Sequence, residues 1–240
     1  MTTPPDGALA VGTTQHAIMP ELSSSALLGL LRLSSTALPV GAYAYSQGLE
    51  WAIGQGWINH AAELGDWLEG LLDHQLACWD VPLLARLYDA LHHGEAAALQ
   101  HWNGWWLAGR NTAELRAEDL QMGNALLQLL DVEKLPVTMP AQATWGSTFA
   151  AAALSHDIPL PQMILGYLWS WSEQQVLAAT RLMPLGQKTA QHLLVQLQGT
   201  MLAAAEQGLA LPDEGLGGSS PGWTLACMLH ETQYSRLFRS

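Results

Sequence analysis

The sequence predicts an all-α protein folded as a single irregular bundle of roughly eight to ten helices. Leu and Ala dominate while Val and Ile are sparse, and apolar positions recur every three or four residues instead of every second one. No segment repeats at a fixed period, which disfavours a helical solenoid. With 240 residues, the chain can bury a full core as one domain, because single domains reach about 250 residues before they split.

The chain is expected to begin with a flexible N-terminal arm at residues 1–20, followed by an all-helical domain at 21–230. The arm has no Lys or Arg and no long apolar run, so it does not resemble a signal peptide. The uncharged stretch 135–156 contains Pro136, Pro140 and several hydroxyl residues, which is unlike a membrane span. These features predict a cytoplasmic protein without a transmembrane helix.

The first half of the domain is expected to contain a turn and two amphipathic helices. Pro39 and Gly41 indicate a turn that feeds a helix carrying Tyr43 and Tyr45. One apolar stripe follows, and Asp80 with Pro82 is expected to restart the helix for a second stripe that Gly94 ends. The stripes consist of Leu64, Trp67, Leu68, Leu71, Leu72 and Leu76, and then of Leu83, Leu84, Leu87, Tyr88 and Leu91.

Tryptophan is concentrated in the next predicted helix, at positions 102, 105 and 106. Their spacing suits a packed helix face, which we favour over an aromatic cage. A further helix is expected to bury one face over 115–130. The Cys78 and Cys227 thiols lie far apart among apolar residues, which favours reduced, buried cysteines over a disulfide.

The C-terminal half is expected to form a helical hairpin or a sharply bent helix. Pro159 and Pro161 open a helix that runs to Val176, Pro184 with Gly186 interrupts it, and an apolar stripe resumes at 193–201. The Gly- and Ser-rich stretch 213–222 predicts a flexible loop before a final short helix.

Composition favours a protein that binds other proteins. The formal net charge of −12, with only nine Lys and Arg, argues against nucleic acid as a partner. Charged residues make up 12% of the chain, about half the usual share, so much of the surface is expected to meet other protein.

Local motifs for catalysis or for a bound cofactor are absent from the sequence. It contains no phosphate-binding glycine loop, no paired-cysteine metal motif, no His-Glu-x-x-His and no Gly-x-Ser-x-Gly. His92 and His93 are interpreted as a solvated helix end and not as metal ligands, and His230 with Glu231 as a polar contact that supports the tail. We therefore expect a non-catalytic protein without metal or cofactor, with a hydrolase of dispersed catalytic residues as the alternative.

The last ten residues, 231–240, are predicted to form a docking tail. One of only two phenylalanines, Phe238, lies there beside Leu237, between Arg236 and Arg239. Aromatic and Arg side chains are enriched at interface hot spots, so exposed apolar side chains here would suit a partner. The equally weighted alternative is that the tail folds back onto its own core.

The segment Leu38-Pro39-Val40-Gly41, followed by Tyr43, Tyr45-Ser46 and Gly48-Leu49-Glu50, is similar to the N-terminal signature of the urease accessory protein UreF family. Three further segments resemble the same family in the expected order: Thr112–Arg116 with Met122-Gly123, the 169–187 region ending in Pro184-Leu185-Gly186-Gln187, and the tail from His230 to Ser240. Ala42 and Ala44 stand where such proteins often carry Gly and Ser.

The resemblance implies an all-helical, dimerising accessory protein that bridges UreD (also called UreH) and the GTPase UreG during nickel insertion into apo-urease. Hydrolysis then belongs to UreG, and a scaffold unrelated to urease is the alternative. Arg116 and Arg181 are the candidates for the surface that faces UreG, with internal salt bridges to Glu114, Glu118 or Glu173 as an equal alternative. The residues assigned to UreD or to the second UreF subunit are Pro39, Gly41, Tyr43, Tyr45, Tyr234, Arg236, Leu237, Phe238 and Arg239.

Overall fold

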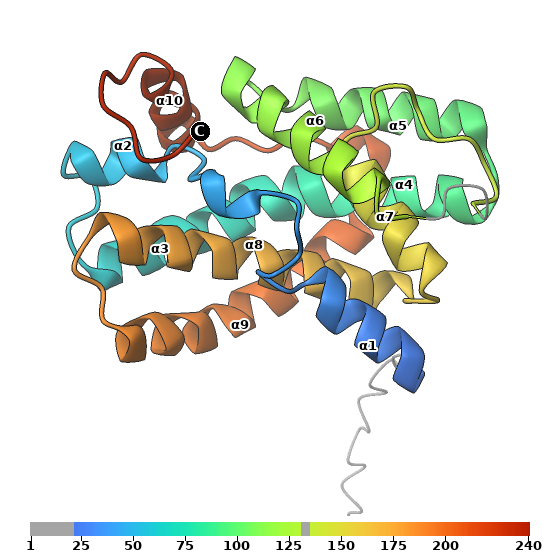
Figure 1. Ribbon diagram of the computed structural model, residues 1–240, viewed down its shortest axis with the longest axis horizontal. Helices are drawn as coiled ribbons and strands as arrows, with labels where there is room; N and C mark the ends of the chain where they lie inside the picture. The colour runs from blue at the N-terminus through green and yellow to red at the C-terminus, as the bar shows by residue number, and fades with distance from the viewer. Residues whose placement is uncertain (1–21, 131–134) are drawn as a thin grey trace, which may run out of the picture.

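The computed structural model describes residues 22–130 and 135–240, and within these ranges it is helical, without a β-strand (Figure 1). This confirms the predicted all-α bundle, while the 1–20 arm lies outside the described residues. No helix in the described ranges is long and apolar enough to cross a membrane. The helices are α1 Ser24–Leu33, α2 Leu49–Gly54, α3 Ala61–Leu71, α4 Val81–His92, α5 Ala96–Ala108, α6 Ala113–Leu127, α7 Trp145–Ser155, α8 Leu160–Leu182, α9 Gln187–Ala210 and α10 Pro221–His230.

Helix starts follow the local capping chemistry of the sequence. Ser23, Thr112 and Thr144 each accept a hydrogen bond at the side-chain oxygen from the backbone N–H three residues later. Each bond satisfies one of the backbone donors that a helix N-terminus leaves free. These caps set the starts of α1, α6 and α7.

The predicted break before Pro82 is wrong. A π-helical segment, Leu72–Asp80, joins α3 to α4 without interruption. Proline has no N–H, and its ring clashes with the carbonyl four residues earlier in an α-helix. Here that carbonyl, on Cys78, accepts a hydrogen bond from Gly217 N at 3.2 Å instead. The change of helical register thus lets the chain pass Pro82 without ending the helix.

The stretch 213–222, predicted to be a flexible loop, is fastened to the body. Ser219 N donates to the carbonyl of His74 in the π-helical segment at 3.3 Å, and Arg86 forms an ion pair with Asp213. A Cβ built on Gly218 would lie 2.9 Å from the same His74 carbonyl oxygen. Glycine is therefore required here for close backbone approach, not for flexibility.

Helices α8 and α9 pack side by side as the predicted hairpin, joined at Met183–Gly186 (Figure 1). The uncharged stretch before them contains α7, which packs against α4 and α6 with nearly all its residues buried.

Of the tryptophans on α5, Trp106 is fully buried, whereas Trp105 stacks on Trp79 at the surface. The prediction of core packing is therefore confirmed for Trp106 and only partly confirmed for the other two tryptophans of α5. Both cysteines are free thiols, with Cys227 buried and Cys78 half-buried.

The turn at Gly41 does not lead directly into a helix that carries both tyrosines, so that prediction is wrong. Ala42–Ala44 forms one 3-10 turn, and α2 begins only at Leu49. Gln47 and Gly48 come first, with φ angles of 53° and 79°. Two successive left-handed residues cannot continue a right-handed helix.

Candidate partner-binding face

The tail divides into a buried part and an exposed part. Phe238 and Ser240 are 4% and 2% exposed, whereas Tyr234 is fully exposed and Leu237 is about half exposed. For Phe238, the expectation of an exposed docking side chain is wrong, since this end of the tail folds back onto the core. The reason is that the body supplies both an apolar contact and partners for the tail's backbone.

The buried end of the tail lies along the segment that resembles the N-terminal signature. Arg239 N donates to the carbonyl of Ala44 at 2.8 Å, and the Ser46 N–H and hydroxyl both donate to the Ser240 carbonyl. Leu237 N and Phe238 N donate to the Glu50 carboxylate at 2.7 and 2.9 Å. The fold thus brings together the two segments from which the sequence predicted partner binding.

Arg181 joins these two segments. Its guanidinium lies over the Phe238 ring, 4.7 Å from the centroid, and donates to the Tyr43 carbonyl at 3.1 Å. Beside it lies a cavity of about 250 Å³, lined by residues of the 35–45 segment, by α8 and by Phe238. Arg116 is exposed on α6 and donates to the Leu107 carbonyl. In the described chain neither arginine forms the ion pair considered as the alternative.

The remaining predicted site residues lie in the segment 39–45. Tyr43 is 75% exposed and Pro39 is exposed, while Gly41 has a φ of 79° at the start of the 3-10 turn. Tyr45 is buried and donates its hydroxyl hydrogen to Gln121 Oε1 at 2.7 Å. Burial, followed by the charge of Glu118, raises the pKa of Tyr45. Tyr45 therefore supports the face from below, and Tyr43 presents its ring to solvent.

A fully buried histidine lies beneath the tail. His230 Nδ1 is 2.7 Å from Glu114 Oε2, and its Nε2 is 3.3 Å from Glu50 Oε2. Arg236 forms an ion pair with the other oxygen of Glu114. Glu231, next in sequence, points elsewhere and accepts from Glu114 N. This agrees with the interpretation of His230 as a polar support for the tail.

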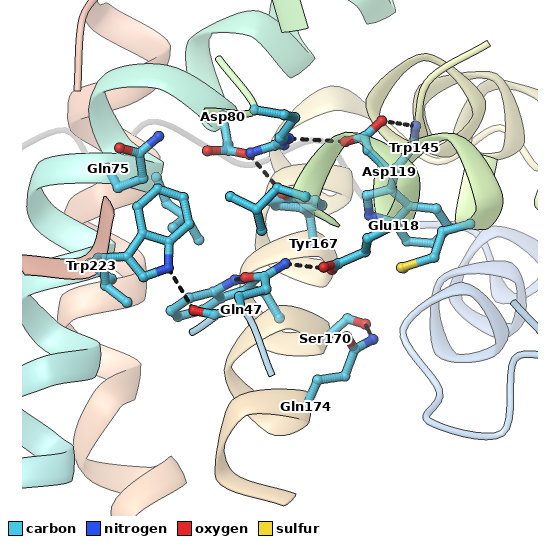
Figure 2. Close-up of a pocket in the computed structure, with 16 residues that line it drawn as sticks. Gln47, Gln75, Asp80, Glu118, Asp119, Trp145, Tyr167, Ser170, Gln174 and Trp223 are labelled. Carbon is cyan, nitrogen blue, oxygen red and sulfur yellow. Dashed lines mark hydrogen bonds and ion pairs between the residues drawn. The ribbon is translucent and has the colours of Figure 1, made fainter. Parts of the chain in front are cut away.

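Glu118 holds the end of the tail from the other side. The Ser240 hydroxyl donates to Glu118 Oε2 at 2.6 Å. Gln47 Nε2 donates to Glu118 Oε1 at 2.7 Å (Figure 2). Burial raises the pKa of Glu118 to about 7, because the loss of water outweighs these hydrogen bonds. This carboxyl group therefore titrates near neutral pH.

A second buried cluster contains Asp80 and Asp119 (Figure 2), and Arg110 forms ion pairs with both. Arg110 donates to Asp80 at 2.6 Å and to Asp119 at 3.0 Å. Desolvation alone would lower the pKa of Arg110, but the two carboxylates outweigh it and hold that pKa well above its ordinary value. The guanidinium remains charged.

Aromatic and backbone donors complete this cluster. The Tyr167 hydroxyl donates to Asp80 at 3.0 Å, and Trp106 Nε1 and Trp145 N donate to Asp119 at 2.6 and 2.8 Å. The adjoining cavity, about 40 Å³, has room for about one water. The second oxygen of Asp80 is buried without a hydrogen-bond partner among the described residues.

Sequence reasoning considered Asp80 only as a helix start and assigned no role to Arg110 or Asp119. It considered Glu114 and Glu118 only as partners of Arg116 and Arg181. The available signal was weak: few charged residues in an apolar chain, some of them inside helical stripes. Within the described residues, no group of three or more His, Cys, Asp or Glu side chains is arranged to hold a metal ion.

Fold and site together define an all-α protein that uses its buried polar side chains to hold distant segments of its own chain against one another. The family model of UreF matches residues 58–198, more than half of the chain. The chain belongs to the UreF family of urease accessory proteins.

Similar proteins extend the match beyond this region. The chain is 46% identical over 218 residues to the urease accessory protein UreF of Chromohalobacter salexigens, covering 90% of the chain and 95% of that protein. It is 48% identical over 215 residues to the UreF of Alkalilimnicola ehrlichii, covering 88% and 94%. For the UreF of Marinobacter nauticus the identity is 46% over 218 residues, covering 90% and 94%.

Proposed function

We propose that this chain acts as a cytoplasmic, non-catalytic subunit that bridges UreD and the GTPase UreG in the complex delivering nickel to apo-urease. Membership of the UreF family and the composition of the face support this proposal. In this assignment GTP hydrolysis is carried out by UreG, and this chain shapes the complex in which nickel is released and can modulate that hydrolysis.

The observation that carries the proposal is the joint face of tail and turn. Tyr43 of the turn is exposed, and so are Tyr234, Arg236, Leu237 and Arg239 of the tail. Aromatic and Arg side chains dominate interface hot spots, because they bury large areas and form several hydrogen bonds at once. Two of the nine Lys and Arg of the chain, Arg236 and Arg239, lie in this tail.

The predicted site residues divide into two roles. Those exposed on the face contact UreD or a second copy of this chain: Pro39, Tyr43, Tyr234, Arg236, Leu237 and Arg239. Those beneath it, Gly41, Tyr45 and Phe238, set its shape. Arg116 and Arg181 are assigned to the side that faces UreG, where Arg116 is exposed and Arg181 lies at the rim of the 250 Å³ cavity.

Co-purification with UreD tests the tail directly. The double variant Tyr234→Ala with Leu237→Ala is expected to weaken the complex by about tenfold or more and to lower urease activation at limiting nickel. Leu209→Ala, a partly exposed leucine on α9 outside the face, is the matched control and should behave as wild type. Unchanged co-purification and activation by the double variant would overturn the assignment of the tail.

Point variants test the tail better than removal of residues 235–240. Deletion takes away Phe238, a core side chain, and exposes the Glu118 carboxylate. Loss of activation after deletion would therefore not separate a lost contact from a destabilised body. The exposed side chains of Tyr234 and Leu237 can be removed without disturbing either buried group.

The alternative surface for the second copy of a homodimer is an apolar groove between α1, α8 and α9, which leaves the tail and the turn to UreD. The groove, about 640 Å³, is lined by Leu31, Trp169 and Leu202, and Leu28 and Val195 add exposed apolar surface nearby. A two-fold interface must be self-complementary, and an apolar patch with few charges meets that requirement.

Charge placed in this groove should disrupt the dimer. Leu31→Glu with Leu202→Glu is expected to give a monomer in light scattering, whereas Leu225→Glu, on the exposed surface of α10, should not. A dimer that survives both groove substitutions would exclude this surface.

A further inference from the structure

Gln47 has a backbone conformation that suits glycine better than glutamine. Among the described residues, Gln47 and Asp157 are the two non-glycine residues with a positive φ, 53° in both. A residue with a Cβ adopts this conformation at a steric cost that glycine does not have. The next residue is a glycine, Gly48, with a φ of 79°. The presence of glutamine at position 47 therefore indicates that its side chain contributes something that outweighs the cost.

The polar groups of Gln47 are bound by three helices. Its Oε1 accepts from Trp171 Nε1 of α8 at 2.8 Å, and its Nε2 donates to Glu118 of α6 at 2.7 Å. Its backbone carbonyl accepts from Trp223 Nε1 of α10 at 2.9 Å (Figure 2). These contacts come from different directions, so together they determine both the side chain and the backbone of this one residue.

The contacts of Gln47 lie where the turn meets the tail. Ser46, the residue before it, donates its N–H and its hydroxyl to the Ser240 carbonyl. Glu118, which Gln47 binds through one oxygen, accepts the Ser240 hydroxyl at the other. The last residue of the tail is thus held by the neighbour of Gln47 and by the carboxylate that Gln47 orients.

We propose that Gln47 is a positioning residue for partner binding: it fixes the tail relative to the turn, so that both present their exposed side chains together. The inference rests on the proposed function, in which UreD contacts both segments, through Tyr43 of the turn and Leu237 of the tail among others. A surface that is ordered in advance loses less conformational entropy when a partner binds. Gln47 raises the affinity for UreD in this way without contacting it.

Hydrogen exchange of the isolated chain, followed by mass spectrometry, measures the positioning itself. Gln47→Gly removes the side-chain contacts and also the steric cost of the left-handed backbone, so the body should remain folded. The reporters are the amides of Ser46 and Arg239, which donate to the carbonyls of Ser240 and Ala44. Their protection should fall by about tenfold or more, while that of the α7 amides should stay as in wild type.

Affinity for UreD measures the consequence. Gln47→Gly should bind UreD about fivefold or more weakly than wild type. Asp157→Gly is the matched control, because it changes the same backbone conformation at an exposed position after α7. This control should retain wild-type protection and affinity.

Gln47→Asn keeps the test decisive should Gln47→Gly fail to fold. Asparagine tolerates the left-handed backbone and keeps the amide, but it is one methylene shorter. Its amide cannot reach both Trp171 and Glu118, so protection and affinity should fall in the same direction as in Gln47→Gly.

Wild-type protection of the Ser46 and Arg239 amides in both Gln47 variants would overturn the positioning. Lost protection with wild-type affinity for UreD would overturn its role in binding. The double variant Tyr234→Ala with Leu237→Ala separates this inference from the proposed function. If the double variant binds UreD as wild type does, the assignment of the tail fails, and the protection measured in the isolated chain still decides whether Gln47 positions it.

Discussion

Two clusters in this protein share one plan, in which one nitrogen-bearing side chain contacts two carboxylates from distant elements. In one, Arg110 lies between Asp80 and Asp119, and in the other, His230 lies between Glu50 and Glu114. The Arg110 cluster closes within the body, whereas the His230 cluster extends to the tail, because Glu114 also pairs with Arg236. The comparison teaches that one bridging plan can either join body elements or reach a terminal segment.

The two clusters also differ in what they hold. Arg110 packs on the Trp106 ring, 4.6 Å from its centroid, and joins the π-helical segment, α5 and α6 within the body. His230 joins α2, α6 and α10 and fastens the tail across them. The arginine thus lies where the body is assembled, and the histidine lies where a terminal segment docks.

The largest expected effect is removal of the permanent cation. Arg110→Leu leaves two buried aspartates without a counter-charge and should lower the free energy of unfolding by about 3–5 kcal/mol. Urea denaturation measures this loss as a lower midpoint of unfolding, while the slope of the unfolding free energy against urea concentration stays unchanged. Arg116→Leu, on the exposed face of α6, should stay within about 0.5 kcal/mol of wild type. Equal effects of the two substitutions would contradict the structural role of Arg110.

A smaller effect concerns Glu118, which contacts the end of the tail. The pKa of Glu118 is about 7 in the folded chain and has its ordinary value of 4.5 in the unfolded chain, so folding favours the protonated form. This contribution is fully present below about pH 4.5 and is lost as the pH rises through about 7, on the order of 3 kcal/mol in all. Urea denaturation across this range should show the loss in wild type. In Glu118→Gln this part of the pH dependence should disappear, and its persistence would exclude Glu118 as the source.

The smallest effect tests the joint between α2 and α10 beside the His230 cluster. Gly41 and Gly48 both have a φ of 79°, but only Gly48 is crowded, since an added Cβ would lie 2.8 Å from Cys227 N. Gly41→Ala should cost about 1 kcal/mol from the left-handed backbone. Gly48→Ala should cost at least about 2 kcal/mol, because overpacking adds to the strain. Thermal unfolding of the two variants measures the difference, and equal costs would show that the α10 contact is unimportant.

Local patterns predicted most helices and failed where distant segments meet. The α8 and α9 hairpin follows from Pro184 and Gly186, because proline and glycine act on their own neighbours in the chain. The continuous passage at Pro82 could not be predicted, since the Cys78 carbonyl is satisfied by Gly217, far along the chain. The same holds for the 213–222 loop, whose composition indicates flexibility while its backbone is bound to the π-helical segment.

The sequence by itself determined the all-α class, the spacing of the helices and the resemblance of turn and tail to UreF, because apolar periodicity and motifs are local properties. Only the tertiary structure decided that Phe238 is buried while Leu237 is exposed. It also decided that Glu50, Glu114 and His230 meet beneath the tail. Such contacts depend on how helix faces pack in three dimensions, and no local pattern encodes which distant carboxylate a histidine will find.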